Sequence, residues 1–148
     1  MRISAKGRYA LASAIHMAQQ HHSGESITLI SISERLGISK IYLEQVFSLL
    51  KRGELVTSVK GAQGGYLLSA APGQISVLDV LTAVETGLFD KTEDTVAERA
   101  PEIEFAMRES AFDVLDNAVA ASLSQISLED LVLASEKHKG DDAAMYYI

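Results

Sequence analysis

No cysteine occurs among the 148 residues of this chain. This absence excludes disulfides, thiolate-ligated metals, cysteine nucleophiles and direct thiol redox sensing. The chain also lacks an apolar run of membrane-spanning length. Met1 is followed by an amphipathic helix pattern rather than a signal sequence, so we expect a cytoplasmic protein. A chain of this length can bury a core without covalent staples.

Residue patterns typical of enzymes are scarce as well. The histidines of the first helix include the adjacent pair His21 and His22, which cannot share a helix face. Serines late in the chain lack a neighbouring histidine and a nucleophile elbow. The glycine run at 61–65 is not followed by the Lys-Ser/Thr of a phosphate-binding loop. We therefore expect a protein that is not an enzyme and holds no cofactor or metal.

Charge is unevenly distributed along the chain. The formal net charge of −7 is unfavourable for binding a polyanion. However, residues 1–68 carry eight Lys/Arg and four Glu, a net of +4. The other five basic and sixteen acidic residues leave 69–148 at −11. This asymmetry predicts one nucleic-acid-binding half, with the acidic half restricting DNA to the basic face.

Residues 28–66 have the pattern of a helix-turn-helix followed by a β wing. Leu29, Ile32 and Leu36 form one stripe of a short helix. Gly37 permits the positive φ of a helix exit, and Ser39 can cap the next helix. The second helix is predicted to bury Leu43, Val46, Phe47 and Leu50 and to expose Lys40, Glu44, Gln45, Ser48 and Lys51.

Two short β segments, 55–59 and 66–68, flank a glycine-rich stretch. Glycines there admit unusual φ values and a close backbone approach, as a tight hairpin requires. Two helices joined by a tight turn, with a polar outer face and a basic hairpin, predict a winged helix-turn-helix transcription factor. Glu44 could accept from a cytosine amino group in the major groove, or it could form a local ion pair on its own helix.

A first helix is expected from about Lys6 to His21 or His22, and basic residues gather at its start. Positive charge there opposes the helix macrodipole, which favours phosphate contacts over an ordinary solvated helix start. Lys51 and Lys60 are expected to hold phosphates, and the wing glycines to approach the minor groove. The predicted DNA-binding residues are Arg2, Lys6, Arg8, Ser39, Lys40, Tyr42, Glu44, Lys51, Lys60, Gln63, Gly64 and Gly65.

The pattern divides the chain into a DNA-binding domain (1–87), a loop with dimerisation and regulatory helices (88–139), and a tail (140–148). A polar, acidic stretch from Asp90 to Glu98 predicts a mobile loop. The longest helix is expected from Pro101 to about Ser122, with an apolar face too broad for one small domain to bury. A two-fold partner would cover this face, although a single core is the alternative. The predicted dimerisation residues are Ile103, Met107, Ala111, Val114, Leu115 and Ala118.

Three motifs, at 1–9, 38–45 and 59–66, resemble the Rrf2 family of bacterial regulators in order and spacing. The resemblance covers roughly the first half of the chain. It implies a mainly α fold with a small β wing, in which a winged helix-turn-helix domain joins a long C-terminal dimerisation helix. Many members hold an iron–sulfur cluster on three cysteines in the loop before that helix. Residues 90–104 contain no Cys or His, and carboxylates do not replace these ligands, so we expect no cluster.

Among members without a cluster, the chain looks most like the repressors of cysteine metabolism. That resemblance implies control through a complex with cysteine synthase (O-acetylserine sulfhydrylase), an enzyme that accepts Ile-ended peptides. The last residues, Met145, Tyr146, Tyr147 and Ile148, follow an acidic lead that we expect to be flexible. Their free carboxylate could enter the partner's anion site, or the apolar residues could pack on the parent domain. The other open interpretation is a cluster-free regulator that senses a different small molecule or partner.

Overall fold

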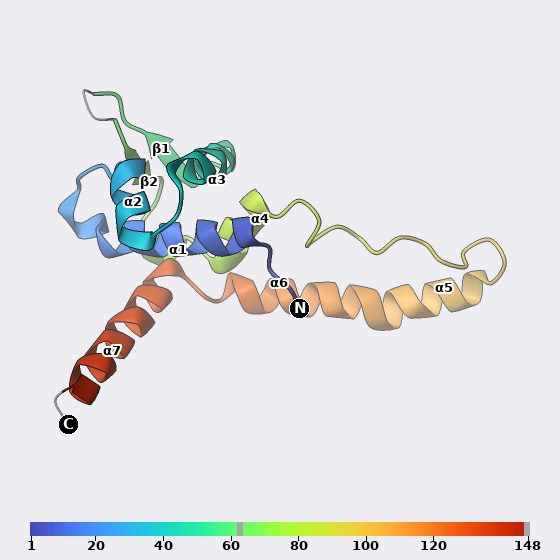
Figure 1. Ribbon diagram of the computed structural model, residues 1–148. Helices are drawn as coiled ribbons and strands as arrows, with labels where there is room; N and C mark the ends of the chain where they lie inside the picture. The colour runs from blue at the N-terminus through green and yellow to red at the C-terminus, as the bar shows by residue number, and fades with distance from the viewer. Residues whose placement is uncertain (62–63, 147–148) are drawn as a thin grey trace.

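The computed structural model describes residues 1–61 and 64–146. Within these ranges the chain is mainly α-helical with one small antiparallel sheet, as the sequence predicts. The elements are α1 (Ala5–Gln19), α2 (Leu29–Leu36), α3 (Lys40–Arg52), β1 (Val56–Ser58), β2 (Tyr66–Leu68), α4 (Val77–Val84), α5 (Pro101–Met107), α6 (Asp113–Ser124) and α7 (Leu128–Tyr146). Figure 1 shows α1 to α4 and the wing gathered at one end, with α5 and α6 forming an arm that extends from it.

The helix-turn-helix begins and ends where its capping residues lie. The hydroxyl of Thr28 accepts from Ser31 N at 3.1 Å, and Ser39 Oγ accepts from Tyr42 N at 3.2 Å. These bonds satisfy backbone donors that a helix start leaves without partners. Gly37 ends α2 with φ +70°, a conformation that is costly for other residues. The predicted bounds of α2 are therefore confirmed.

The wing is a hairpin of β1 and β2 with the register Val56 to Leu68 and Ser58 to Tyr66. Ile27 pairs with the other edge of Tyr66, which fixes the hairpin to the segment before α2. Gly65 has φ +125°, and a Cβ there would lie 3.0 Å from Ser26 Oγ. Only glycine fits this close approach without strain.

One apolar core joins α1, α2, α3 and α4. Its buried members include Met17 of α1, Ile32 of α2, Phe47 of α3 and Val80 of α4. Leu128, the first residue of α7, is fully buried in the same cluster. The last helix therefore begins inside the core of the first domain, although it follows the arm in sequence.

A loop connects α4 to the arm. It runs outward from the end of α4, and α5 and α6 return towards the domain (Figure 1). Between α5 and α6 the residues Arg108–Phe112 form a π-helical turn. The sequence predicts one uninterrupted α-helix here; the extra residue of a π turn instead rotates the faces of α5 and α6 relative to each other.

Two other sequence-based expectations about helices need correction. α1 ends at Gln19, and His21–Ser23 form a separate 3-10 turn rather than the last residues of the helix. α7 runs to Tyr146, so its backbone is helical through the acidic segment that we expected to be flexible. Tyr147 and Ile148 lie outside the described residues.

Candidate nucleic-acid interface

The outer side of α3 is the centre of the candidate interface. Leu43, Val46, Phe47 and Leu50 are at most 1 % exposed, so the inner side of the helix is core. The side chains of Lys40, Glu44, Gln45, Ser48 and Lys51 are exposed on the other side. A helix with one face fixed in a core and a row of polar side chains on the other suits insertion into a major groove.

Ile41 is 72 % exposed on the first turn of α3, and the sequence-based prediction missed it. The signal was present, because Ile41 falls outside the spacing of the buried residues Leu43, Val46, Phe47 and Leu50. An apolar side chain at the start of a groove-reading helix can contact the methyl group of thymine. Ile41 therefore joins the candidate base-reading residues.

Glu44 and Lys40 form the local ion pair that the sequence left as an alternative. Lys40 Nζ lies 4.0 Å from Glu44 Oε1, and both side chains are more than half exposed. A pair this long and this exposed is worth a fraction of a kcal/mol. Neither side chain is held away from a nucleic acid by the contact.

The start of α1 lies against the start of α3. The rings of Tyr9 and Tyr42 meet edge to face, with centroids 5.1 Å apart and planes at 87°. Arg8 precedes Tyr9 and is exposed, as is Arg2, whereas Lys6 is partly buried. Tyr42 is itself half-buried by this packing, so only part of its ring is available to a base or phosphate.

The end of α3 is joined to the wing. Lys51 Nζ donates to Ser58 Oγ on β1 at 3.0 Å. Lys60 is exposed just beyond β1, and Gly64 and Gly65 adopt the positive φ values that the hairpin predicts. Gln63 lies outside the described residues. One contact thus joins the start of α1 to the start of α3, and another joins the end of α3 to the wing.

The arm presents its apolar residues to the outside. Ile103, Val114 and Leu115 are 52 %, 57 % and 60 % exposed, and Ala111 and Ala118 are also exposed, whereas Met107 is half-buried. Phe105 is 66 % exposed beside them. In a single copy of the chain, this apolar face of the arm is therefore exposed to water.

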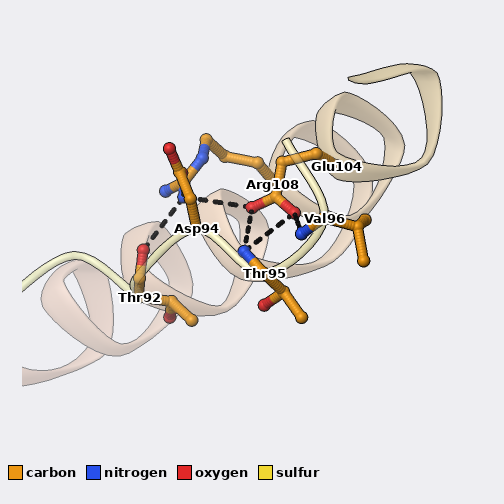
Figure 2. A network of polar contacts seen from close by, with 6 residues as sticks. All are labelled: Thr92, Asp94, Thr95, Val96, Glu104 and Arg108. Carbon is orange, nitrogen blue, oxygen red and sulfur yellow. Dashed lines mark hydrogen bonds and ion pairs between the residues drawn. The ribbon is translucent and has the colours of Figure 1, made fainter. Parts of the chain in front are cut away.

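The loop along the arm is tied down by a polar network at its outer part (Figure 2). The buried carboxylate of Glu104 accepts from Val96 N at 2.8 Å and from Thr95 N at 3.1 Å. Arg108 donates to the carbonyl of Thr92 at 2.9 Å and pairs with Asp94 at 2.7 Å. Residues 90–98 form a loop, as predicted, and side chains of Glu104 and Arg108 satisfy backbone groups between Thr92 and Val96. The mobility of this loop stays a prediction.

The family profile described as "Iron-dependent Transcriptional regulator", Rrf2, matches residues 3–134. A regulator of Xenorhabdus nematophila named IscR is 38 % identical over 136 residues, which is 92 % of this chain and 82 % of the relative. The structure of CymR, described as the global cysteine regulator of B. subtilis, aligns with a TM-score of 0.71 at 33 % identity, covering 90 % of this chain and 98 % of that one. IscR of T. potens aligns with a TM-score of 0.72 at 31 % identity, covering 93 % and 90 %.

These relatives are transcriptional regulators and not enzymes, as the sequence predicts. In the described part of the chain, no helix is long and apolar enough to cross a membrane. The profile match spans nearly the whole chain, and the winged helix is shared with the solved structures. The chain belongs to the Rrf2 family of DNA-binding transcriptional regulators.

Proposed function

We propose that this regulator is a cytoplasmic repressor that binds a palindromic operator as a homodimer. The observation that carries the proposal is that the exposed polar side of α3 is joined to the start of α1 by the Tyr9–Tyr42 contact and to the wing by the Lys51–Ser58 bond. Together these three segments are the proposed DNA-binding surface. A two-fold dimer would place its two α3 helices in successive major grooves, with centres about 34 Å apart.

Within this surface, Ser39, Lys40, Tyr42 and Glu44 are proposed to meet base edges. Lys51 and Lys60 are proposed to hold phosphates, with the wing at the minor groove. The bond from Lys51 to Ser58 supports this role, because an ammonium group has three donors and one bond orients it while leaving the others for a phosphate.

Replacing Lys60 by alanine tests this surface. We expect Lys60→Ala to weaken binding to all duplexes alike and to reduce the slope of log K against log salt by about one. Lys137→Ala is the matched control, since Lys137 is an exposed lysine on α7 far from the surface in sequence. A loss confined to one operator sequence, or an equal loss in both variants, would contradict the assignment.

The exposed apolar face of the arm supports the homodimer. We propose that Ile103, Met107, Ala111, Val114, Leu115 and Ala118 pack against a second copy. Leu115→Glu puts a charge at the centre of this face and should yield monomers in sedimentation equilibrium, because an unpaired charge is costly to bury. A wild-type protein that sediments as a monomer at all concentrations ends this part of the proposal.

We also propose that the regulator works without an iron–sulfur cluster, although its family description mentions iron. The chain has no cysteine, and a cluster of this kind needs thiolate or imidazole ligands. In the described residues Glu104 is occupied by backbone N–H groups of the loop. DNA affinity should be the same before and after treatment with an iron chelator; loss of affinity on chelation would refute the proposal.

For the partner, we propose a complex with cysteine synthase, made by the last four residues, Met145 to Ile148. The likeness to CymR, described as a cysteine regulator, supports the link to cysteine metabolism. Removing Met145–Ile148 should abolish binding of cysteine synthase in calorimetry while leaving DNA affinity intact. Unchanged binding of the enzyme would favour the alternative, a cluster-free regulator that senses another small molecule or protein.

A further inference from the structure

Glu85 lies directly after α4 and holds the first residues of the chain. Its Oε1 accepts from Ser4 N at 3.0 Å and from Ser4 Oγ at 2.7 Å. Ser4 Oγ in turn accepts from Gly7 N at 3.1 Å. The carboxylate, the serine hydroxyl and the first turn of α1 thus form one chain of hydrogen bonds, in which a helix N-terminus favours the negative charge.

Gly7 makes room for this contact. It is buried, and a Cβ there would overlap the carboxylate of Glu85 and lie 2.9 Å from Ile3 Cγ2. A first turn that bore any side chain at this position would have to displace Glu85. The sequence therefore combines a glycine in the first turn of α1, where alanine would be the better helix former, with a carboxylate 78 positions later that needs the space.

The segment held in this way carries the basic start of the proposed DNA-binding surface and also lies beside the arm. A cleft beside it is lined by Arg2, Ser4, Arg8, Glu85 and Leu88. On its other side Met1 and Arg2 line a groove with Leu115 and Val119 of α6. α4 ends at Val84, directly before Glu85. After α4 the chain leaves for the loop and the arm (Figure 1).

We propose that Glu85 is a positioning residue for DNA binding: it fixes the first turn of α1 so that Arg2 and Arg8 meet phosphates. The inference rests on the proposed DNA-binding surface. It predicts that removing Glu85 weakens DNA binding. Simple electrostatics predicts the opposite change in affinity, because a carboxylate near phosphate-binding guanidinium groups repels DNA. If Glu85 acted only through its charge, removing it would tighten binding.

The test measures affinity and salt dependence on a duplex that the wild-type protein selects from a random library. Glu85→Ala should weaken binding about tenfold and make the salt slope shallower by about one to two, as expected when two phosphate contacts are lost. Glu85→Gln keeps an acceptor for Ser4 and should bind within about twofold of wild type. Gly7→Ala should reproduce Glu85→Ala, although alanine is the better helix former.

The matched control is Asp79→Ala, at the other end of the same helix. Asp79 accepts from Ser76 N at 2.9 Å in a capping box, so its loss weakens α4 without touching the start of α1. Affinity and slope should stay at the wild-type values in this variant. Equal losses in Asp79→Ala and Glu85→Ala would show a general effect of α4 and overturn the proposal. Tighter binding by Glu85→Ala, or binding by Glu85→Gln that is tighter by more than about twofold, would overturn it as well.

The double variant Arg2→Ala/Arg8→Ala separates failure of the inference from failure of the surface. A shallower slope in this variant with a wild-type slope in Glu85→Ala would reject the positioning role alone. A wild-type slope in the arginine variant would reject this part of the DNA-binding surface. If Glu85→Ala does not fold, the other two variants still test the proposal. The positioning role requires Gly7→Ala to lose affinity for DNA and Glu85→Gln to keep it.

Discussion

Replacement of Leu128 by alanine asks whether α7 belongs to the folding unit of the DNA-binding domain. Leu128 is 0 % exposed and lies in the cluster that contains Met17 and Phe47. Leucine to alanine removes about three carbons, worth roughly 2.4 kcal/mol at about 0.8 kcal/mol each. The unfilled cavity adds to this, so we expect the free energy of unfolding to fall by about 3 to 5 kcal/mol.

A loss of this size is a large part of the 5 to 15 kcal/mol that typically stabilises a domain. It should lower Tm by roughly 10 °C in a chain of this length. Urea unfolding, followed by circular dichroism, should show a lower midpoint with an unchanged m-value. Loss of α7 helicity with unchanged unfolding of the rest would show that the substitution affects one helix only.

Leu133→Ala is the matched control, because Leu133 is on the same helix and 64 % exposed. Its cost should stay below about 1 kcal/mol. Both variants are compared at a low and a high protein concentration, since a side chain buried by a second copy would show a loss that depends on concentration. If Leu128→Ala costs no more than Leu133→Ala, α7 does not stabilise the domain and the reasoning fails.

Three further outcomes follow from single residues. Glu104→Ala should remove the acceptor of Val96 N and cost about 1 to 3 kcal/mol of local stability. The amide of Val96 should then exchange its hydrogen faster, and unchanged exchange would contradict the role of Glu104 in holding the loop. Glu54 has φ +62°, a conformation that strains a residue with a side chain and that glycine adopts at lower cost. Glu54→Gly should therefore raise Tm by a few degrees, and a lower Tm would contradict this strain. Burial, followed by the charge of Arg35, lowers the pKa of His16 below its ordinary value of 6.5. The unfolded state therefore binds the proton more tightly, and stability should fall as the pH drops below 6.5, a decline that His16→Gln should reduce in urea titrations.

The helix-turn-helix could be predicted closely because its signals are local. The stripe of Leu29, Ile32 and Leu36, the caps and the glycine exit all act within a few residues, and α2 begins and ends as expected. The exposed residues of α3 could be predicted from the same spacing, because they are the positions that lie between the buried ones.

The interactions of the acidic half could not be predicted in the same way. Glu104 has the sequence signature of a solvated helix residue, and its buried role depends on the backbone of a loop eight residues earlier. The acidic segment near the end of the chain is expected to be flexible from its composition, but α7 continues through it to Tyr146. Glu85 and Gly7 are far apart in sequence, and only the fold brings the carboxylate onto the first turn of α1.

The loop after α4 is held at both ends, and this bears on how the two halves of the chain communicate. At its start, Glu85 is bonded to Ser4 beside the basic segment. At its outer part, Thr95 and Val96 of the loop donate to Glu104 of the arm. α7 is set in the core of the first domain at Leu128. Any coupling between the arm and the first domain therefore has two covalent routes, the loop and α7, and each is anchored on that domain by a named residue, Glu85 and Leu128.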